Sequence, residues 1–364
     1  MNKEVISDTQ GICLMTMFIV GTSSMQVSGL SSEQNLWISI IMSILISMPI
    51  MFIYSRLYEL FPERNILEVA EICFGKFIGK ILIGLFAFYM IKETYEVLRN
   101  ASQFITTVNF PETPLIIILI VITLLCIFTT KQGLEVTSRF SKLFLPILIM
   151  FILFFSLSSI PNMDINNIYP IFDDGLNPII KGIFQTFLFP FTQILSFPII
   201  LSSLERKKSS YNIYFTSLFL GGILLFILSV TSLLVLGIES TTSVYHPTYL
   251  VAARIRIGPY VQGIEILIST TLILAAFIKI SVLLLSSCIA LAHLFNFEDY
   301  RFIITPIALL CINLSYLMVD NIKEYWEWTD KVWYHFAFPF QIILPIFIWF
   351  FAEIKHKHLE KRLL

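Results

Sequence analysis

The stretch FIVGTSSMQVSG, residues 18–29, interrupts a hydrophobic segment with small and polar residues. Apolar side chains run up to Val20, and four small residues, Gly21 to Ser24, follow directly. Irregular backbone at membrane depth survives only where protein or a water-filled cavity covers it. We therefore expect this segment to unwind around a site inside a membrane protein.

The composition supports a bilayer setting. Of 364 residues, 57% are hydrophobic and 13% are charged, with a mean hydropathy of +0.83. A soluble domain averages about 25% charged residues. Lys and Arg total 24 against 25 Asp and Glu, so the charge balance indicates no nucleic-acid surface.

Signals for enzymatic or metal chemistry are missing from the sequence. The five cysteines form no CxxC pair, which indicates neither a disulfide framework nor a zinc site. The five histidines are scattered, and no GxGxxG, GxSxG or HExxH motif occurs. We expect no catalytic residue, no bound metal and no cofactor. The N-terminus has no features of a cleavable signal, because Lys3 is offset by Glu4 and Asp8.

Ten segments are long and apolar enough to span a bilayer, which takes roughly 20 apolar residues. They are residues 10–29, 36–60, 77–101, 112–130, 142–160, 178–204, 211–237, 261–293, 301–319 and 332–353. The gaps between them are short. The sequence therefore predicts a single transmembrane domain over residues 1–364, in two halves of about 7–160 and 177–353, with a basic tail at 354–364.

The distribution of Lys and Arg predicts the orientation. With the N-terminus inside, the cytoplasmic connections hold Lys3, Arg56, Arg64, Lys76, Lys80, Lys131, Arg139, Lys142, Arg206, Lys207, Lys208, Arg301, Lys355, Lys357, Lys361 and Arg362. The outer connections hold only Lys181, Arg254, Arg256, Lys323 and Lys331. We expect both termini in the cytoplasm.

The third span carries Lys92, Glu93, Glu96 and Arg99. Lys92 with Glu96 and Glu96 with Arg99 have the spacing of neutralising pairs on one helical face. This face cannot be exposed to lipid, since a charged side chain at the bilayer centre costs roughly 2.5–3.5 kcal/mol or more. A packing network and a functional network are both open at this point. Glu265, at the start of the eighth span, is grouped with these charges.

Lys279 lies near the middle of the eighth span, with no acidic residue at i±3 or i±4. Snorkelling to the interface is the alternative, but the stem would have to stretch far from the midplane to reach water. We favour a functional lysine that faces the protein interior.

The sixth span, FLFPFTQILSFPII, places Thr192 and Gln193 between Pro190 and Pro198. Each proline removes a backbone donor and leaves an upstream carbonyl unbonded. A kinked helix is one reading, and a broken helix is the other. Spans 1 and 6 would each be the first span of one half of the chain. Breaks in corresponding positions of two halves indicate a transporter's binding site. The run from Gly21 to Ser24, followed by Gln26 and Ser28, is the matching feature of span 1.

The chain resembles the spore germination permeases, the GerAB-type B subunits of nutrient germinant receptors, in the amino acid–polyamine–organocation superfamily. The matching stretches run end to end: ISDTQG (6–11), PERNILEVAEICFGKFIGKIL (62–82), FPETPLIIIL (110–119), GLEVTSRFSKLF (133–144), YHPTYLVAARIRIG (245–258), FIKIS (277–281) and FPFQIILP (338–345). The resemblance implies an all-α membrane protein with ten transmembrane helices in a five-plus-five inverted repeat (LeuT-like), with helices 1 and 6 broken.

The resemblance also implies roles for individual residues. Gly21 matches the glycine of the unwound segment that is thought to hold a ligand carboxylate, Tyr89 matches an aromatic that faces the pocket, and Lys279 falls in an F-x-K pattern. Many relatives have Gly-Glu at Thr192–Gln193, and an Arg at Gly263. We therefore expect a pocket without a carboxylate partner for a ligand amine. The predicted ligand-binding residues are Gly21, Thr22, Ser23, Ser24, Tyr89, Thr192, Gln193 and Lys279, and the charged network is Lys92, Glu93, Glu96, Arg99 and Glu265.

Two functions fit this pattern. The first is a germinant-receptor subunit that binds a small nutrient, with an amino acid expected, and triggers germination through A and C partner subunits. The second is an ion- or proton-coupled amino-acid transporter. The resemblance favours the receptor and implies a place in the spore inner membrane.

Overall fold

The computed structural model describes residues 6–173, 175–201, 204, 209–255 and 264–363. These residues are helical apart from turns and loops, and an isolated bridge joins Ile6 to Leu204. The helices are α1 (Asp8–Val20), α2 (Leu36–Leu60), α3 (Ile66–Val108), α4 (Leu115–Gln132), α5 (Leu134–Ser159), α6 (Asn177–Thr186), α7 (Phe197–Ile200), α8 (Ser209–Ser243), α9 (Pro247–Arg254), α10 (Ile264–Phe295), α11 (Arg301–Leu317), α12 (Ile322–Trp328), α13 (Tyr334–Phe338) and α14 (Leu344–Leu363). Short helical turns lie between them: η1 (Thr22–Met25), η2 (Leu30–Asn35), η3 (Ile160–Asn162), η4 (Ile165–Ile168), η5 (Phe187–Phe191), η6 (Gln193–Ser196), η7 (Thr329–Trp333) and η8 (Pro339–Ile343).

The prediction of an all-helical membrane protein is confirmed. Eight helical segments of the described chain are long and apolar enough to cross a membrane: Leu30–Leu60, Ile66–Val108, Leu115–Gln132, Leu134–Asn162, Asn177–Ile200, Ser209–Ser243, Ile264–Phe295 and Ile322–His358. Two predicted spans contain shorter helices. The helix in 10–29 stops at Val20 because the chain turns at Gly21, and the helix in 301–319 has 17 residues.

Local sequence sets where the helices begin. Ser7 accepts from the amide of Gln10 while the Gln10 side chain accepts from the amide of Ser7, so ISDTQG is a capping box for α1. Asn65 caps α3 in the same manner, by accepting from the amide of Glu68 at 2.9 Å. Gly75 has φ +77°, a conformation that side chains disfavour, and it bends α3 near its start.

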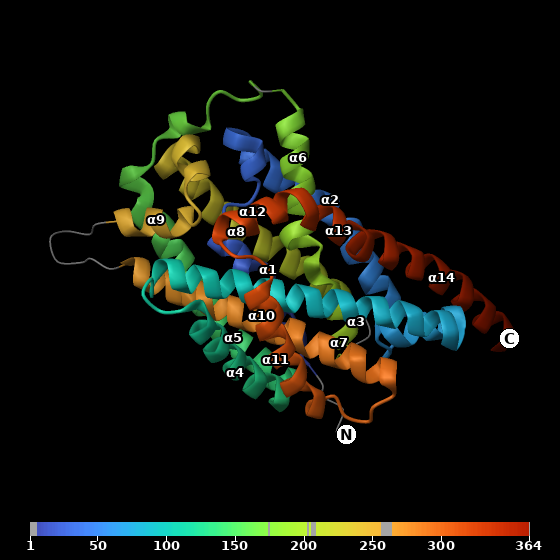
Figure 1. Ribbon diagram of the computed structural model, residues 1–364. Helices are drawn as coiled ribbons and strands as arrows, with labels where there is room; N and C mark the ends of the chain where they lie inside the picture. Colours follow the sequence, from blue (N-terminus) through green and yellow to red (C-terminus); the bar gives the residue numbers. More distant parts are fainter. Residues whose placement is uncertain (1–5, 174, 202–203, 205–208, 256–263, 364) are drawn as a thin grey trace.

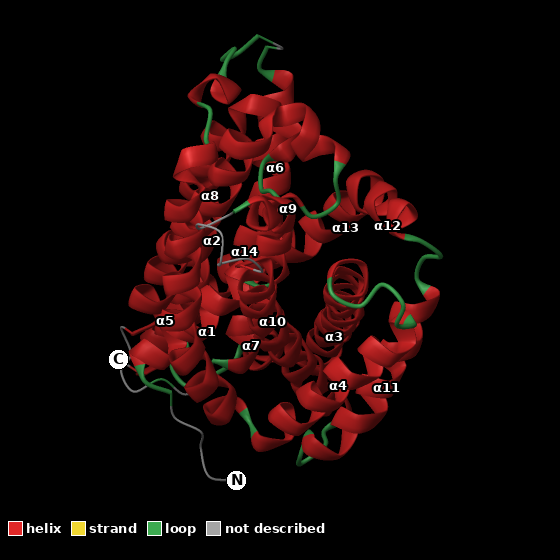
Figure 2. Ribbon diagram, turned by 90° about the vertical axis from the view of Figure 1, so that its left-hand side faces the viewer, coloured by secondary structure: helices red, strands yellow, loops and turns green. Residues whose placement is uncertain are grey.

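The helices that carry the site pack together in the centre of the molecule. α10 packs along α3 and also contacts α1, and α8 packs against α1 and α2. In both views α6, α9 and α12 gather toward the upper end, and α4, α7 and α11 toward the lower end (Figures 1 and 2). The interrupted segments pack against these helices, because η1 contacts α3, α8 and α10, and η6 contacts α1 and α10.

Part of the orientation prediction falls on residues that are not described. Lys3, Arg206, Lys207, Lys208 and Arg256 lie outside the described residues, as does Gly263, and so do the side chains of Lys361 and Arg362. The cytoplasmic position of both termini stays a prediction.

Gly182 provides a test of this packing. A methyl group on Gly182 would lie 1.8 Å from Ser32 Oγ and 3.1 Å from its backbone nitrogen, where α6 crosses η2. We expect Gly182→Ala to lower stability by about 1–3 kcal/mol, as overpacking does. Gly84→Ala is the matched control, because its methyl group would meet only Leu294 Cδ2, at 3.9 Å. The measurement is the thermal unfolding midpoint of the purified chain, and equal midpoints for both variants would contradict the packing.

Candidate functional site

The break in the first span begins at Gly21, as the sequence predicts. α1 ends there with φ 11° and ψ −127°, and η1 continues the chain in a different direction. Ser24 Oγ donates to the Gly21 carbonyl at 2.8 Å, which satisfies one of the backbone groups that the break releases. The hydroxyls of Thr22 and Ser23 are buried, and no hydrogen-bond partner for either lies within the described residues.

The Lys279 side chain crosses this break. A methyl group on Gly21 would lie 2.6 Å from Lys279 Cδ and 3.1 Å from Lys279 Cβ, so the absence of a side chain makes room for the lysine stem. The ammonium lies 5.1 Å from the ring centre of Phe18 and 4.7 Å from that of Phe189. Gly21 and Lys279, two of the predicted binding-site residues, are therefore in direct contact.

Lys279 makes no direct polar contact with the break or with the ion pair of the third span. In the part of the chain that the structure describes, its ammonium has no hydrogen-bond acceptor, so it does not donate to carbonyls of the break. It forms no ion pair with Glu96, whose partner is Lys92. The side chain is fully buried and interacts electrostatically with Glu93. Aromatic faces, which attract cations, surround its charge instead.

The sixth span is broken where the two prolines predict it. α6 ends at Thr186, η5 and η6 follow, and the helix resumes as α7 at Phe197. Thr192 Oγ1 donates to Gln341 Oε1 at 2.8 Å, and Gln341 Nε2 donates to the Tyr89 hydroxyl at 2.7 Å. Tyr89 also stacks on Phe340 at 4.8 Å. Tyr89 therefore fixes the break to η8, and its hydroxyl also interacts with Glu93. Its predicted role in ligand binding stays a prediction.

Gln193 binds a carboxylate from the third span. Its Nε2 donates to Glu93 Oε2, and Trp333 Nε1 donates to Glu93 Oε1 at 3.2 Å. Glu93 is fully buried. The expectation of a pocket without a carboxylate partner is wrong, because α3 supplies the acid that the sixth span lacks.

The charged network divides into separate contacts. Lys92 and Glu96 form the predicted ion pair, and the Lys92 ammonium lies over the rings of Trp328 and Phe336 at 4.6 and 4.4 Å. The predicted pairing of Glu96 with Arg99 is wrong. Arg99 instead donates to the carbonyls at the end of α11, Ser315 at 3.2 Å and Val319 at 3.0 Å.

Glu265 lies apart from these groups. It is half-buried in the first turn of α10, where its charge acts on Tyr249, a residue of α9. Of the predicted network, Lys92 and Glu96 pair with each other, whereas Glu93, Arg99 and Glu265 each contact other groups.

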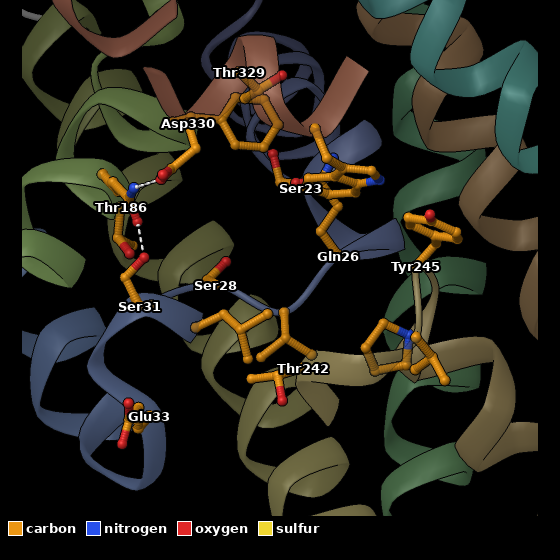
Figure 3. Close-up of a pocket in the computed structure, with 18 of the residues that line it drawn as sticks. Ser23, Gln26, Ser28, Ser31, Glu33, Thr186, Thr242, Tyr245, Thr329 and Asp330 are labelled. Carbon is orange, nitrogen blue, oxygen red and sulfur yellow. Dashed lines mark hydrogen bonds between the residues drawn. The ribbon is translucent and has the colours of Figure 1, made fainter. Parts of the chain in front are cut away.

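Two cavities lie between the broken segments. The larger, which we call the chamber, has a volume of about 630 Å³ and is walled by η2, α6, the turn before α9, and α12 with η7 (Figure 3). The smaller, the inner pocket, has a volume of about 30 Å³, and Thr22, Glu93, Glu96 and Gln193 contribute to its wall. Gln26, Phe189 and Thr329 line both cavities, so the inner pocket lies directly behind the chamber.

A hydrogen-bonded group closes one side of the chamber. Ser31 Oγ donates to Gln185 Oε1 at 2.5 Å, and Gln185 Nε2 donates to Asp330 at 2.7 Å, as the dashed lines of Figure 3 show. Lys181 pairs with Asp330 at 3.2 Å. These contacts join η2, α6 and η7 around the cavity.

The predicted ligand-binding residues divide into two groups. Ser23 lines the chamber, and Thr22 and Gln193 line the inner pocket. Gly21, Ser24, Tyr89, Thr192 and Lys279 line neither cavity and support the breaks from behind. Sequence reasoning missed Phe189, Trp333 and Gln341. Of these, Gln341 carried a signal, as a polar residue within the apolar stretch FPFQIILP.

This architecture is that of a multi-pass membrane protein with a transporter-like fold. Two solved structures share it, each with a TM-score of 0.67. The transporter Mhp1, of the nucleobase-cation-symport-1 family, in a closed conformation with bromovinylhydantoin bound, is 13% identical and aligns over 93% of this chain and 77% of its own. A substrate-bound, outward-open Na⁺-coupled sialic acid symporter is 12% identical and aligns over 92% and 77%.

The chain belongs to the spore germination protein family, whose model matches residues 5–323. Spore germination protein KB of Bacillus subtilis (strain 168) is 23% identical over 99% of this chain and 98% of its own length. Spore germination protein XB of Bacillus anthracis is 23% identical over 87% and 89%. The resemblance seen in the sequence is confirmed, and the chain is a germination membrane protein. A permease family and a transporter-like fold suggest a non-enzymatic role.

The contact between Gly21 and Lys279 predicts that their substitutions are coupled. We expect Gly21→Ala to be destabilising, because its methyl group overlaps Lys279 Cδ. In a Lys279→Ala background that atom is gone, so Gly21→Ala should cost less by about 0.5–3 kcal/mol, the range for residues in contact. Unfolding midpoints of the wild type, both single variants and the double variant measure the coupling. Strict additivity would contradict the contact.

Gln193→Glu tests the bond to Glu93. The change sets two carboxylates against each other, and like charges at that distance disfavour joint ionisation. We expect the variant to lose stability relative to wild type as the pH rises from about 5 to about 8, and its ligand preference to move toward cations, which neutralise the pair. Thermal unfolding across this pH range and a ligand panel are the measurements. A variant that matches the wild type in both would exclude this placement of Gln193.

Proposed function

We propose that this protein is the membrane subunit of a nutrient-germinant receptor, which binds a small nutrient, an amino acid, and triggers germination through A and C partner subunits. The observation that carries the proposal is the chamber that leads to a polar pocket between two broken helices. Its volume of about 630 Å³ lies within the range of about 300–1,000 Å³ that is usual for small-molecule sites.

The topology we propose has ten spans in two inverted halves, about 7–160 and 177–353, with α1 and α11 as the two shorter spans and 354–364 as a tail. Both termini are cytoplasmic in this arrangement, and the protein resides in the spore inner membrane. The loops around α6, α9 and α12 then face outward, and the chamber opens toward incoming nutrient.

The alternative is an ion- or proton-coupled amino-acid transporter, which the fold of the symporters favours. Fold alone does not decide between the two functions. Uptake of a labelled amino acid by vesicles that contain this chain alone distinguishes the receptor from the transporter. The receptor predicts nutrient-dependent germination that requires the A and C subunits, and no concentrative uptake of a labelled amino acid. Robust uptake by the chain alone would establish the transporter instead.

Within the receptor, we propose that Lys279 acts as a built-in cation beside the break in span 1, so that ligand binding needs no sodium. Its stem fills the space beside Gly21, and its charge is held inside the protein without a direct acidic partner among the described residues. A buried charge of this kind costs stability. Its presence is therefore better explained by function than by packing.

Lys279→Met tests this role. Methionine keeps most of the volume and removes the buried charge, so we expect an unfolding midpoint equal to or above that of wild type. We expect the rate of nutrient-triggered germination to fall by about ten-fold or more, the equivalent of 1.4 kcal/mol of lost coupling. Protein level in spores is the control. A fully active variant, or a wild-type response that requires sodium, would contradict the role.

A further inference from the structure

The inner pocket presents oxygen atoms that lack partners. Thr22 and Gln193 are 0% and 2% exposed, and neither Thr22 Oγ1 nor Gln193 Oε1 has a hydrogen-bond partner within the described residues. The Gln193 amide group must face Glu93 with its NH₂ end, because a carboxylate accepts hydrogen bonds and does not donate them. Its carbonyl oxygen is therefore the end left open. An unbonded buried polar group costs about 1–3 kcal/mol, which favours a ligand that donates to it.

The pocket also carries a negative charge without a direct cationic partner. The side chains that hydrogen-bond to Glu93, which are Gln193, Trp333 and Tyr89, are neutral. Lys92 neutralises Glu96 and not Glu93. Lys279 interacts with Glu93 electrostatically, but its ammonium forms no direct ion pair with it among the described residues. That ammonium lies against Phe189, which borders the pocket. The negative charge of Glu93 and the unbonded oxygens of Thr22 and Gln193 together favour binding of a small cation that has hydrogen-bond donors.

The size of the pocket restricts that cation. A volume of about 30 Å³ holds one or two groups the size of water, each of which needs about 10–15 Å³. It does not hold a whole nutrient. Gln26, Phe189 and Thr329 border both cavities, so a ligand can place one charged end in the pocket and its body in the chamber.

We infer that the inner pocket binds the primary ammonium group of the ligand. Glu93 neutralises its charge, and the Gln193 carbonyl oxygen and the Thr22 hydroxyl accept its N–H groups. An ammonium has three donors and no acceptor, which matches a carboxylate flanked by two open oxygens. This inference deepens the proposed function, on which it rests, by assigning which end of the amino acid enters the inner pocket and which residues hold it.

The test uses the purified full-length chain in detergent and its thermal unfolding midpoint. Methylammonium chloride is the probe, since it is the smallest organic compound with the proposed group. Tetramethylammonium chloride has the same charge and no N–H donor, and the chlorides of sodium and potassium represent inorganic cations. Glu239→Gln is the matched control for Glu93→Gln, because Glu239 is exposed and lines neither cavity.

We expect methylammonium to raise the midpoint of wild type and of Glu239→Gln more than the other three salts at equal concentration. In Glu93→Gln the half-maximal concentration should rise about ten-fold or more, the value of one charge-assisted hydrogen bond. Thr22→Val, which removes an acceptor with little change in shape, should raise it as well and serves if Glu93→Gln does not fold. Equal shifts from tetramethylammonium, sodium or potassium, or wild-type behaviour of both pocket variants, would overturn the inference.

Failure of this inference is distinguishable from failure of the proposed function. The salt experiment needs no partner subunit and no germination response. If methylammonium acts through Glu93 while spores with and without this protein germinate alike, the pocket is correct and the receptor role is wrong. If germination depends on the protein but methylammonium has no specific effect, the receptor role stands and the ammonium assignment falls.

Discussion

The lysine stem that crosses Gly21 is the contact on which the rest of the site depends. A helix that breaks inside a membrane exposes backbone groups that lipid cannot satisfy, so protein atoms must cover them. Here Ser24 bonds the carbonyl of Gly21, and the methylene groups of Lys279 fill the space that a side chain on Gly21 would need. The same lysine places its buried ammonium over the ring of Phe189, one of the residues that border both cavities.

The second break is held by two chains of hydrogen bonds that end on the same two segments. One runs from Thr192 through Gln341 to Tyr89, and the other joins Gln193, Glu93 and Trp333. Each therefore ties the sixth span to α3 and to the last span. A ligand that changes the contacts of Gln193 also acts on both of these elements. We propose that a change in these hydrogen bonds on nutrient binding shifts α3 and the last span, and that partner subunits respond to this shift.

Much of this arrangement follows from local sequence. The run Gly21–Ser24 predicts the first break, because small and polar residues interrupt an apolar span. The prolines at 190 and 198 predict the second, because each removes a backbone hydrogen-bond donor. The ion pair of Lys92 and Glu96 follows from helical spacing. The burial of Lys279 follows from its depth in an apolar span.

The contacts that were missed join distant segments. Gln193 and Glu93 are 100 residues apart in the sequence. The periodicity of a single helix cannot predict a contact between two separate helices. Arg99 had an acidic neighbour at the right spacing, but the open carbonyls at the end of α11 provide several acceptors at once. Tyr89 was placed in the pocket by the resemblance to the family. Its direction is set by Phe340 and Gln341 of η8, which one sequence does not reveal.

The central claim is that the chamber is the route by which nutrient reaches the two breaks, and labelling of Gln26→Cys tests it most directly. Gln26 is half-buried and borders both cavities. A Cys73→Ser background suits the experiment, because the other four native cysteines are buried. The account predicts that a membrane-impermeant thiol reagent modifies this cysteine from the outer side, and that an amino acid that triggers germination slows the modification. A cysteine that reacts only from the cytoplasmic side, or at a rate that no germinant changes, would contradict it.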